Sequence, residues 1–124
     1  MLQSITPVLY THEMEATIHF YRKVLGFSGS AYHQGMSWTI LHRDGVSIML
    51  SLPNAHIPFH QPQFTGSFYI RTDQVDVLWN EWKDTCKVCY PIEDFDYGMR
   101  EFAIYDNNGY LLQFGQDIFS SPIS

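Results

Sequence analysis

Hydrophobic and polar positions follow the same order twice along this chain: a strand pattern, a helix pattern, then three more strand patterns. In the first half, residues 5–10 are predicted to form a strand, and apolar residues recur at helical spacing from His12 to Leu25. Gly26 follows as a glycine that ends the predicted helix. Three strands are expected after it, at about 28–33, 36–42 and 46–51.

The second half repeats this order after a connector. The stretch from Pro53 to Gly66 contains three prolines and no regular period, which is typical of a loop. A predicted strand at 67–71 and a predicted helix at 73–85 follow, the helix with its apolar residues on one face. Three strands are again expected, near 87–91, 99–105 and 110–115.

The two halves are related as an internal repeat. Laying Thr6 on Ser67 gives an offset of 61 residues (67 − 6), and laying Gly45 on Gly109 gives 64 (109 − 45). Similar elements at a nearly constant offset indicate a repeated unit. The predicted fold class is therefore α+β, with two tandem βαβββ modules that form a cupped mixed sheet and carry their helices on its outer face. We expect one domain, 1–124, with module one at about 5–52, the connector at 53–66 and module two at about 67–116.

Two motifs resemble a known superfamily. They are FYRKVLGF, at the end of the run from Ile5 to Phe27, and YGMREFAIYDNNGYLLQFGQ, from Tyr97 to Gln116. Both are similar to motifs of the glyoxalase/bleomycin-resistance/extradiol-dioxygenase superfamily, the vicinal oxygen chelate proteins, and the chain looks closest to its bleomycin-resistance-like branch. The resemblance spans about residues 5–116. It implies the paired βαβββ cup, usually completed by a second chain in a homodimer.

The resemblance also implies where a metal would bind, because the superfamily's enzymes hold a divalent ion through the first and last strands of each module. The motifs place those positions at Thr6, Met49, Ser67 and Gln113. Two hydroxyls, a thioether and one neutral amide lack the basic nitrogens and carboxylates that such ions need. His56 and His60 stand four residues apart, but the intervening proline disfavours the helix that would bring them together. We therefore expect no metal and no cofactor.

Strand alternation extends this placement to the neighbouring side chains. If the positions named by the resemblance face into the cup, flat rings, a flexible methionine and a few polar groups line it. The predicted ligand-binding residues are Tyr10, Trp38, Ile40, Met49, Tyr69, Arg100, Phe102 and Gln113. A two-residue turn at Asp44-Gly45 would pair Ile40 with Met49, and a four-residue turn at 106–109 would pair Phe102 with Gln113. A slip of one residue would invert either assignment. Such a lining suits an aromatic ligand.

Three functions stay open at this stage. The leading hypothesis is a metal-independent protein of bleomycin-resistance type, which sequesters an aromatic small molecule between two protomers. The alternative is a glyoxalase-like lyase or isomerase with an atypical or absent metal site, which would use Glu101, Arg100 or His42 as acid–base groups. Strand parity places Glu101 on the helix side, where a carboxylate needs a partner. The third hypothesis is a ligand sensor or a scaffold, and no set of catalytic residues is evident.

Composition and charge narrow the class of partner. Hydrophobic residues make up 45% of the chain, which is typical of a globular protein. Aromatic residues make up 16%, and aromatic side chains can line a cavity that binds a flat ligand. A formal charge of −6 with seven Lys and Arg argues against nucleic acid. No apolar run approaches a membrane span and no signal-peptide pattern is present, which predicts a cytoplasmic location. Cys86 and Cys89 follow a predicted helix without a second pair of soft ligands, so we expect neither a redox nor a zinc role.

Overall fold

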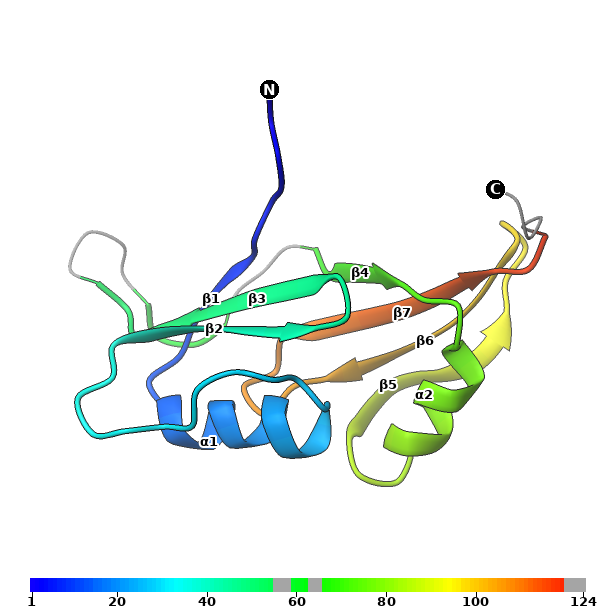
Figure 1. Cartoon of the computed structure of the whole chain (residues 1–124). Coiled ribbons are helices and arrows are strands. Elements are labelled where there is room, and N and C mark those ends of the chain that lie inside the picture. The colour runs from blue at the N-terminus through cyan, green and yellow to red at the C-terminus, as the bar shows by residue number, and fades with distance from the viewer. Residues whose placement is uncertain (55–58, 63–65, 120–124) are drawn as a thin grey trace. The chain divides into compact units, whose positions relative to one another are not determined.

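The computed structural model describes residues 1–54, 59–62 and 66–119. The chain divides into two compact units, Met1–Pro62 and Gln63–Ser124, and each is described here by itself. Each unit contains one mixed sheet and one α-helix, so the fold class is α+β, as predicted (Figure 1).

The sheet of the first unit contains β1 (Val8–Tyr10), β2 (Trp38–Arg43) and β3 (Val46–Ser51) in the order β1-β3-β2. β1 runs parallel to β3, and β2 runs antiparallel to it. The predicted hairpin is confirmed together with its register, because Ile40 lies opposite Met49. Asp44 has a φ of 52°, the left-handed conformation that a two-residue hairpin turn requires.

The predicted helix of the first unit is divided into two parts. α1 covers Met14–His19, and a π-helical turn, η1 (Phe20–Val24), continues it. The N–H of Leu25 donates to the carbonyl of Phe20, five residues back, which is the π-helical pattern. The core between helix and sheet consists of Leu9, Met14, Ile18, Tyr21, Leu25, Leu41, Ile48 and Leu50.

The strand predicted at 28–33 is wrong. Only Ser28 makes a bridge, to His42 at the edge of the sheet. The segment contains Gly29 and Ala31, and both residue types are depleted in strands. The first unit therefore has a three-stranded sheet where four strands were expected.

The second unit contains β4 (Phe68–Arg71), α2 (Val75–Trp82), β5 (Lys87–Asp94), β6 (Met99–Tyr105) and β7 (Leu111–Asp117). Its sheet has the order β4-β7-β6-β5, with β4 parallel to β7 and the other pairs antiparallel. α2 packs on one face, where Trp82 is 2% exposed and its ring contacts the rings of Phe102 and Phe114. The other face of this sheet is not covered by α2, and we call it the open face of the second unit.

The hairpin between β6 and β7 differs from the prediction by one residue. Ala103, not Phe102, lies opposite Gln113. The loop spans 106–110 because the Asp106 carboxylate accepts hydrogen bonds from the N–H groups of Asn108 and Tyr110, both at 2.9 Å. This one-residue difference exchanges the two faces of β6, because strand side chains alternate.

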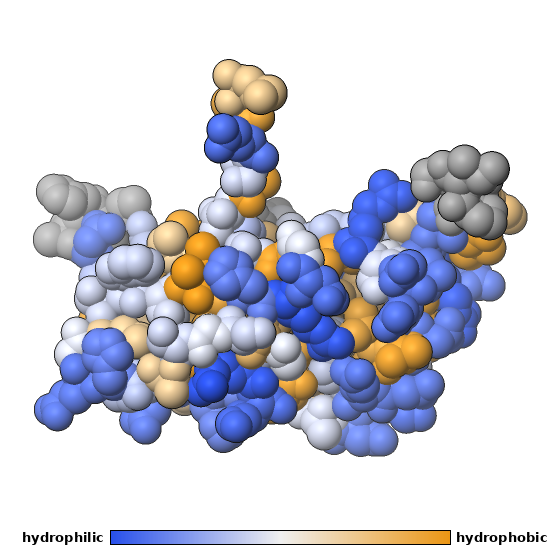
Figure 2. Space-filling model, in the orientation of Figure 1, coloured by the Kyte–Doolittle hydropathy of each residue, from blue (hydrophilic) through white to orange (hydrophobic). Residues whose placement is uncertain are grey.

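Within the part of the chain that is described, no helix has the length and apolarity needed to span a membrane. Polar residues cover most of the side seen in Figure 2. Leu2 and Ile5, which precede β1, are 100% and 92% exposed.

Candidate ligand-binding site

A buried carboxylate lies at the centre of the open face of the second unit. Glu101 is 1% exposed and accepts hydrogen bonds from three phenols. Tyr69 and Tyr97 donate to its Oε1 at 2.8 and 2.6 Å, and Tyr90 donates to its Oε2. We call these four residues the tyrosine cluster. An ionised carboxylate can only accept hydrogen bonds, so three donors replace most of the water that Glu101 loses on burial.

A glycine allows Tyr69 to reach this carboxylate. Tyr69 belongs to β4 and Glu101 to β6, and β7 lies between the two strands with Gly115 directly opposite Glu101. A Cβ atom at position 115 would lie 2.1 Å from the Tyr69 hydroxyl oxygen. Because Gly115 has no side chain, the ring of Tyr69 crosses over β7.

The cluster continues into two further polar side chains. Gln113 donates from Nε2 to the Tyr90 hydroxyl at 2.8 Å, and Ser67 donates its hydroxyl to Gln113 Oε1. The amide of Gln113 is thus used at both ends. Ser67, Tyr69 and Gln113 are three of the residues of the second module for which the sequence predicted this face.

The environment of the phenols keeps them protonated. Burial and the hydrogen bond donated to Glu101 raise the pKa values of Tyr69 and Tyr90 well above their usual range. The same two causes, in that order, raise the pKa of Tyr97 to about 12. All three hydroxyls therefore remain hydrogen-bond donors to Glu101 at neutral pH.

The rings of the cluster remain accessible although their hydroxyls are anchored. Tyr97 is 63% and Tyr69 42% exposed. Tyr97 stacks on Phe95 with centroids 5.5 Å apart and planes at 14°, and Tyr90 meets the same Phe95 ring edge-on at 5.7 Å. The arrangement presents oriented aromatic surface around a fixed negative charge, and such surface stacks on flat ligands.

The first unit has its own open face, the one opposite α1. Strand pairing places Tyr10, Trp38, Ile40 and Met49 together on it, as predicted. Trp38 is 58% exposed, and His42 forms a 2.7 Å hydrogen bond with Ser47 on the same face. Four of the predicted ligand-binding residues thus form one aromatic and aliphatic surface.

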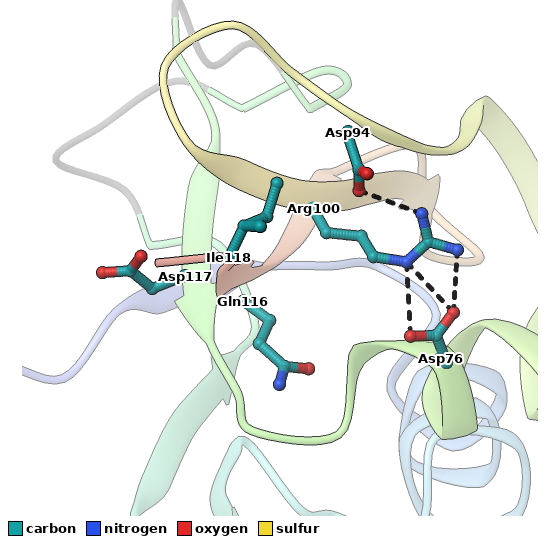
Figure 3. A pocket seen from close by; sticks show the side chains of 6 residues that line it. All are labelled: Asp76, Asp94, Arg100, Gln116, Asp117 and Ile118. Carbon is teal, nitrogen blue, oxygen red and sulfur yellow. Dashed lines mark hydrogen bonds and ion pairs between the residues drawn. The ribbon is translucent and has the colours of Figure 1, made fainter. Parts of the chain in front are cut away.

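The predictions for Phe102 and Arg100 are wrong, because β6 is shifted by one residue. Phe102 is fully buried on the helix-covered face, where it contacts the ring of Trp79. Arg100 lies on that side too and donates to Asp76 of α2 at 2.9–3.2 Å and to Asp94 at 3.0 Å (Figure 3). These hydrogen bonds raise the pKa of Arg100 further above its usual range.

Arg100 lines a pocket of about 290 Å³ on this side of the second unit. The lining residues are Asp76, Asp94, Arg100, Gln116, Asp117 and Ile118. In Figure 3 the guanidinium lies between Asp76 and Asp94, so both of its donor edges are used. Arg100 therefore links α2 to the sheet, and its charge is balanced within the protein.

Sequence reasoning placed Glu101 on the wrong face and so missed the centre of the site. A signal for the correct register was present. Pairing Phe102 with Phe114 gathers the apolar residues of β6 and β7 on one face and leaves Glu101 with Gln113 and Gly115 on the other. The apolar pattern of two neighbouring strands is a better guide to register than an assumed loop length.

The superfamily's metal positions do not fit a metal here. Thr6, Met49, Ser67 and Gln113 offer hydroxyl, thioether and amide groups, and the Gln113 oxygen already accepts from Ser67. Among the described residues, no three His, Cys, Asp or Glu side chains gather as a metal site would require. His56 lies outside the described residues.

The chain contains two units in tandem. In each unit the first strand runs parallel to the last strand and a helix packs on one face of the sheet, which defines a protein built from two βαβ-type modules. Residues 3–114 match the sequence model of the Glyoxalase/Bleomycin resistance protein/Dioxygenase superfamily. The chain belongs to this superfamily, as the two motifs predicted. No curated protein matches the chain.

Solved structures share the fold at low sequence identity. A superfamily member from Sphaerobacter thermophilus has a TM-score of 0.78 and 17% identity, covering 94% of this chain and 98% of that one. The bleomycin resistance determinant encoded on transposon Tn5 has a TM-score of 0.73 and 20% identity, with coverages of 94% and 98%. A lactoylglutathione lyase from Agrobacterium tumefaciens has a TM-score of 0.70 and 21% identity, with coverages of 92% and 92%.

Proposed function

We propose that this chain is a metal-independent binding protein that captures an aromatic small molecule on its open sheet faces. The observation that carries the proposal is the accessible aromatic surface on both faces, with Trp38 in the first unit and the tyrosine cluster in the second. Each ring pair formed with a ligand contributes roughly 0.5–1.5 kcal/mol beyond the area buried. Capture would be stoichiometric, with no covalent step.

The donor chemistry of the family metal positions supports metal independence. Among the four positions, only Met49 and Gln113 carry groups that resemble metal ligands. The Met49 thioether binds hard or borderline ions weakly, and so does the Gln113 amide, which is already hydrogen-bonded to Ser67 and Tyr90. Titration of chelator-treated protein with nickel, zinc, manganese and iron(II) in a calorimeter tests this part. We expect no stoichiometric binding, and one tightly bound ion per chain would contradict it.

We include in the proposal a homodimer in which open faces of two copies enclose the ligand, because the resemblance to the superfamily implies a cup completed by a second chain. Capture of a toxic compound in this manner confers resistance in proportion to the amount of protein. Sedimentation of the protein with and without ligand measures the oligomeric state independently of binding.

The binding proposal is tested by titrating planar aromatic compounds while tryptophan fluorescence is recorded. A Trp38→Leu variant should lose the ligand-dependent signal and bind more weakly, because its ring is 58% exposed on the open face. Tyr32→Leu is the matched control, since Tyr32 is 37% exposed but lies outside the strands. Equal affinity of Trp38→Leu, of a Tyr69→Leu variant and of the unaltered protein would contradict the proposal.

A second candidate is a glyoxalase-like lyase or isomerase that transfers protons without a metal. The tyrosine cluster favours it, because hydrogen bonds connect a carboxylate to three phenols on an accessible face, and such a chain of groups can transfer protons. Turnover of a hemithioacetal that disappears in Glu101→Gln would establish this candidate. Binding without turnover is the outcome expected from the capture proposal.

A further inference from the structure

We propose that the tyrosine cluster recognises an alkylated ammonium group, so that the preferred ligand is an organic cation. This inference rests on the proposed binding function and adds the charge of the ligand to it. The site consists of the exposed rings of Tyr69 and Tyr97, the ring of Tyr90, and the buried charge of Glu101 beneath them.

The charge around the cluster favours a cation. Glu93 lies directly opposite Glu101 in the β5–β6 pair, so two carboxylates share this part of the face. Arg100 adjoins Glu101 along β6, but its guanidinium lies on the helix-covered side, where it bonds to Asp76 and Asp94. On the same face as Glu101, Arg71 lies opposite Gly115, and its guanidinium is 3.8 Å from the Asp117 carboxylate. Among the described hydrogen bonds, every donor to Glu101 is a neutral phenol. Its charge is therefore stabilised but not neutralised.

The orientation of the phenols strengthens the same preference. Each hydroxyl donates to the carboxylate, and a donor bonded to an anion is polarised so that electron density on its ring increases. Electron-rich ring faces attract cations, most strongly where water is partly excluded. The stacked pair of Phe95 and Tyr97 adds a further ring beside the site.

The kind of cation follows from the hydrogen bonds already made. Glu101 is 1% exposed and accepts from three phenols, so its oxygens offer little to an ammonium that carries N–H donors. An ammonium whose nitrogen bears alkyl groups needs no acceptor, and it loses less hydration on contact with rings than a primary ammonium does. The cluster is therefore suited to a methylated or quaternary ammonium.

The test compares choline with its uncharged tert-butyl isostere in a nuclear magnetic resonance titration that follows the ring protons of Tyr69 and Tyr97. We expect saturable shifts with choline and about tenfold weaker binding of the isostere, which corresponds to a cation–π contribution within the usual range. Equal binding of the two compounds, or no binding of choline, overturns the inference.

Variants assign the effect to the cluster. Glu101→Gln should weaken choline several-fold and leave the isostere unchanged, and Tyr97→Leu, at an exposed position that leaves the core intact, should also weaken choline. Tyr105→Leu is the matched control, because the Tyr105 ring already lies 5.4 Å from the Lys87 ammonium. If an uncharged aromatic compound binds and choline does not, the inference fails while the proposed function stands. If neither binds, both fail.

Discussion

Replacing Gly115 by alanine tests whether one missing side chain holds the tyrosine cluster together. The added Cβ would lie 2.1 Å from the hydroxyl oxygen and 2.7 Å from the Cζ atom of Tyr69, so the ring must swing away. The backbone itself tolerates alanine, since its φ lies outside the left-handed range. The direct consequence is loss of the 2.8 Å hydrogen bond from Tyr69 to Glu101.

The size of the effect is worked from that bond. A hydrogen bond to a charged, buried group contributes about 1.5–3 kcal/mol, and alanine in a strand recovers roughly 0.5–1 kcal/mol relative to glycine. Gly115→Ala should therefore lower the free energy of unfolding by about 1–2 kcal/mol, a shift of the urea midpoint of about 1 M. Equilibrium urea unfolding followed by circular dichroism measures it.

A double-mutant cycle shows whether the loss passes through Tyr69. Tyr69→Phe removes the hydrogen bond beforehand and frees the ring to move, so Gly115→Ala should cost almost nothing in that background. The same cost in both backgrounds would refute the reasoning, because the strain would then lie elsewhere in the sheet. Tyr105→Phe is a suitable control, since its hydroxyl bonds to Cys89 and not to Glu101.

Three further predictions follow from contacts of the described residues. The pKa of Tyr97 rises from 10.0 to about 12 on folding, so the stabilisation that this phenol contributes is complete below pH 10 and is lost as the pH rises toward 12. The urea midpoint of unfolding should therefore fall between pH 10 and pH 12, and it should fall less in the Glu101→Gln variant. Asp106→Ala removes the buried acceptor of two N–H groups and should cost about 1–3 kcal/mol in urea unfolding, whereas Asp106→Asn should retain most of the stability. In thermal unfolding, Trp82→Ala should cost about 3–5 kcal/mol because its side chain is buried, while Trp38→Ala on the open face should cost less than about 0.5 kcal/mol.

The contrast between the two hairpins shows what the sequence can predict. Asp44-Gly45 permits essentially one tight turn, and the register of β2 on β3 followed correctly from it. The loop at 106–110 has no such restriction, and its length depends on where one carboxylate finds two N–H donors. Local backbone preference determines the first register, while a side-chain contact formed only in the folded chain determines the second.

The sequence assigned side chains to the correct sheet face only in the hairpin whose strand register it predicted correctly. Tyr10, Trp38, Ile40 and Met49 share a face because their hairpin was placed correctly. Glu101 was assigned to the opposite face, so the convergence of three phenols on it was not foreseen. Such a convergence joins residues from β4, β5, β6 and the loop between β5 and β6. The order of these strands in the sheet differs from their order in the sequence, so residue spacing carries little information about the convergence.

The pairing of β4 with β7 has a consequence for how the second unit is made during translation. β4 has β7 as its neighbour in the sheet, although β4 ends at residue 71 and β7 begins only at residue 111, an offset of 40 residues (111 − 71). While the ribosome synthesises α2, β5 and β6, the backbone groups of β4 have no strand to bond to. The sheet can close only after residue 117 has left the exit tunnel, so this unit is expected to form late and in one step.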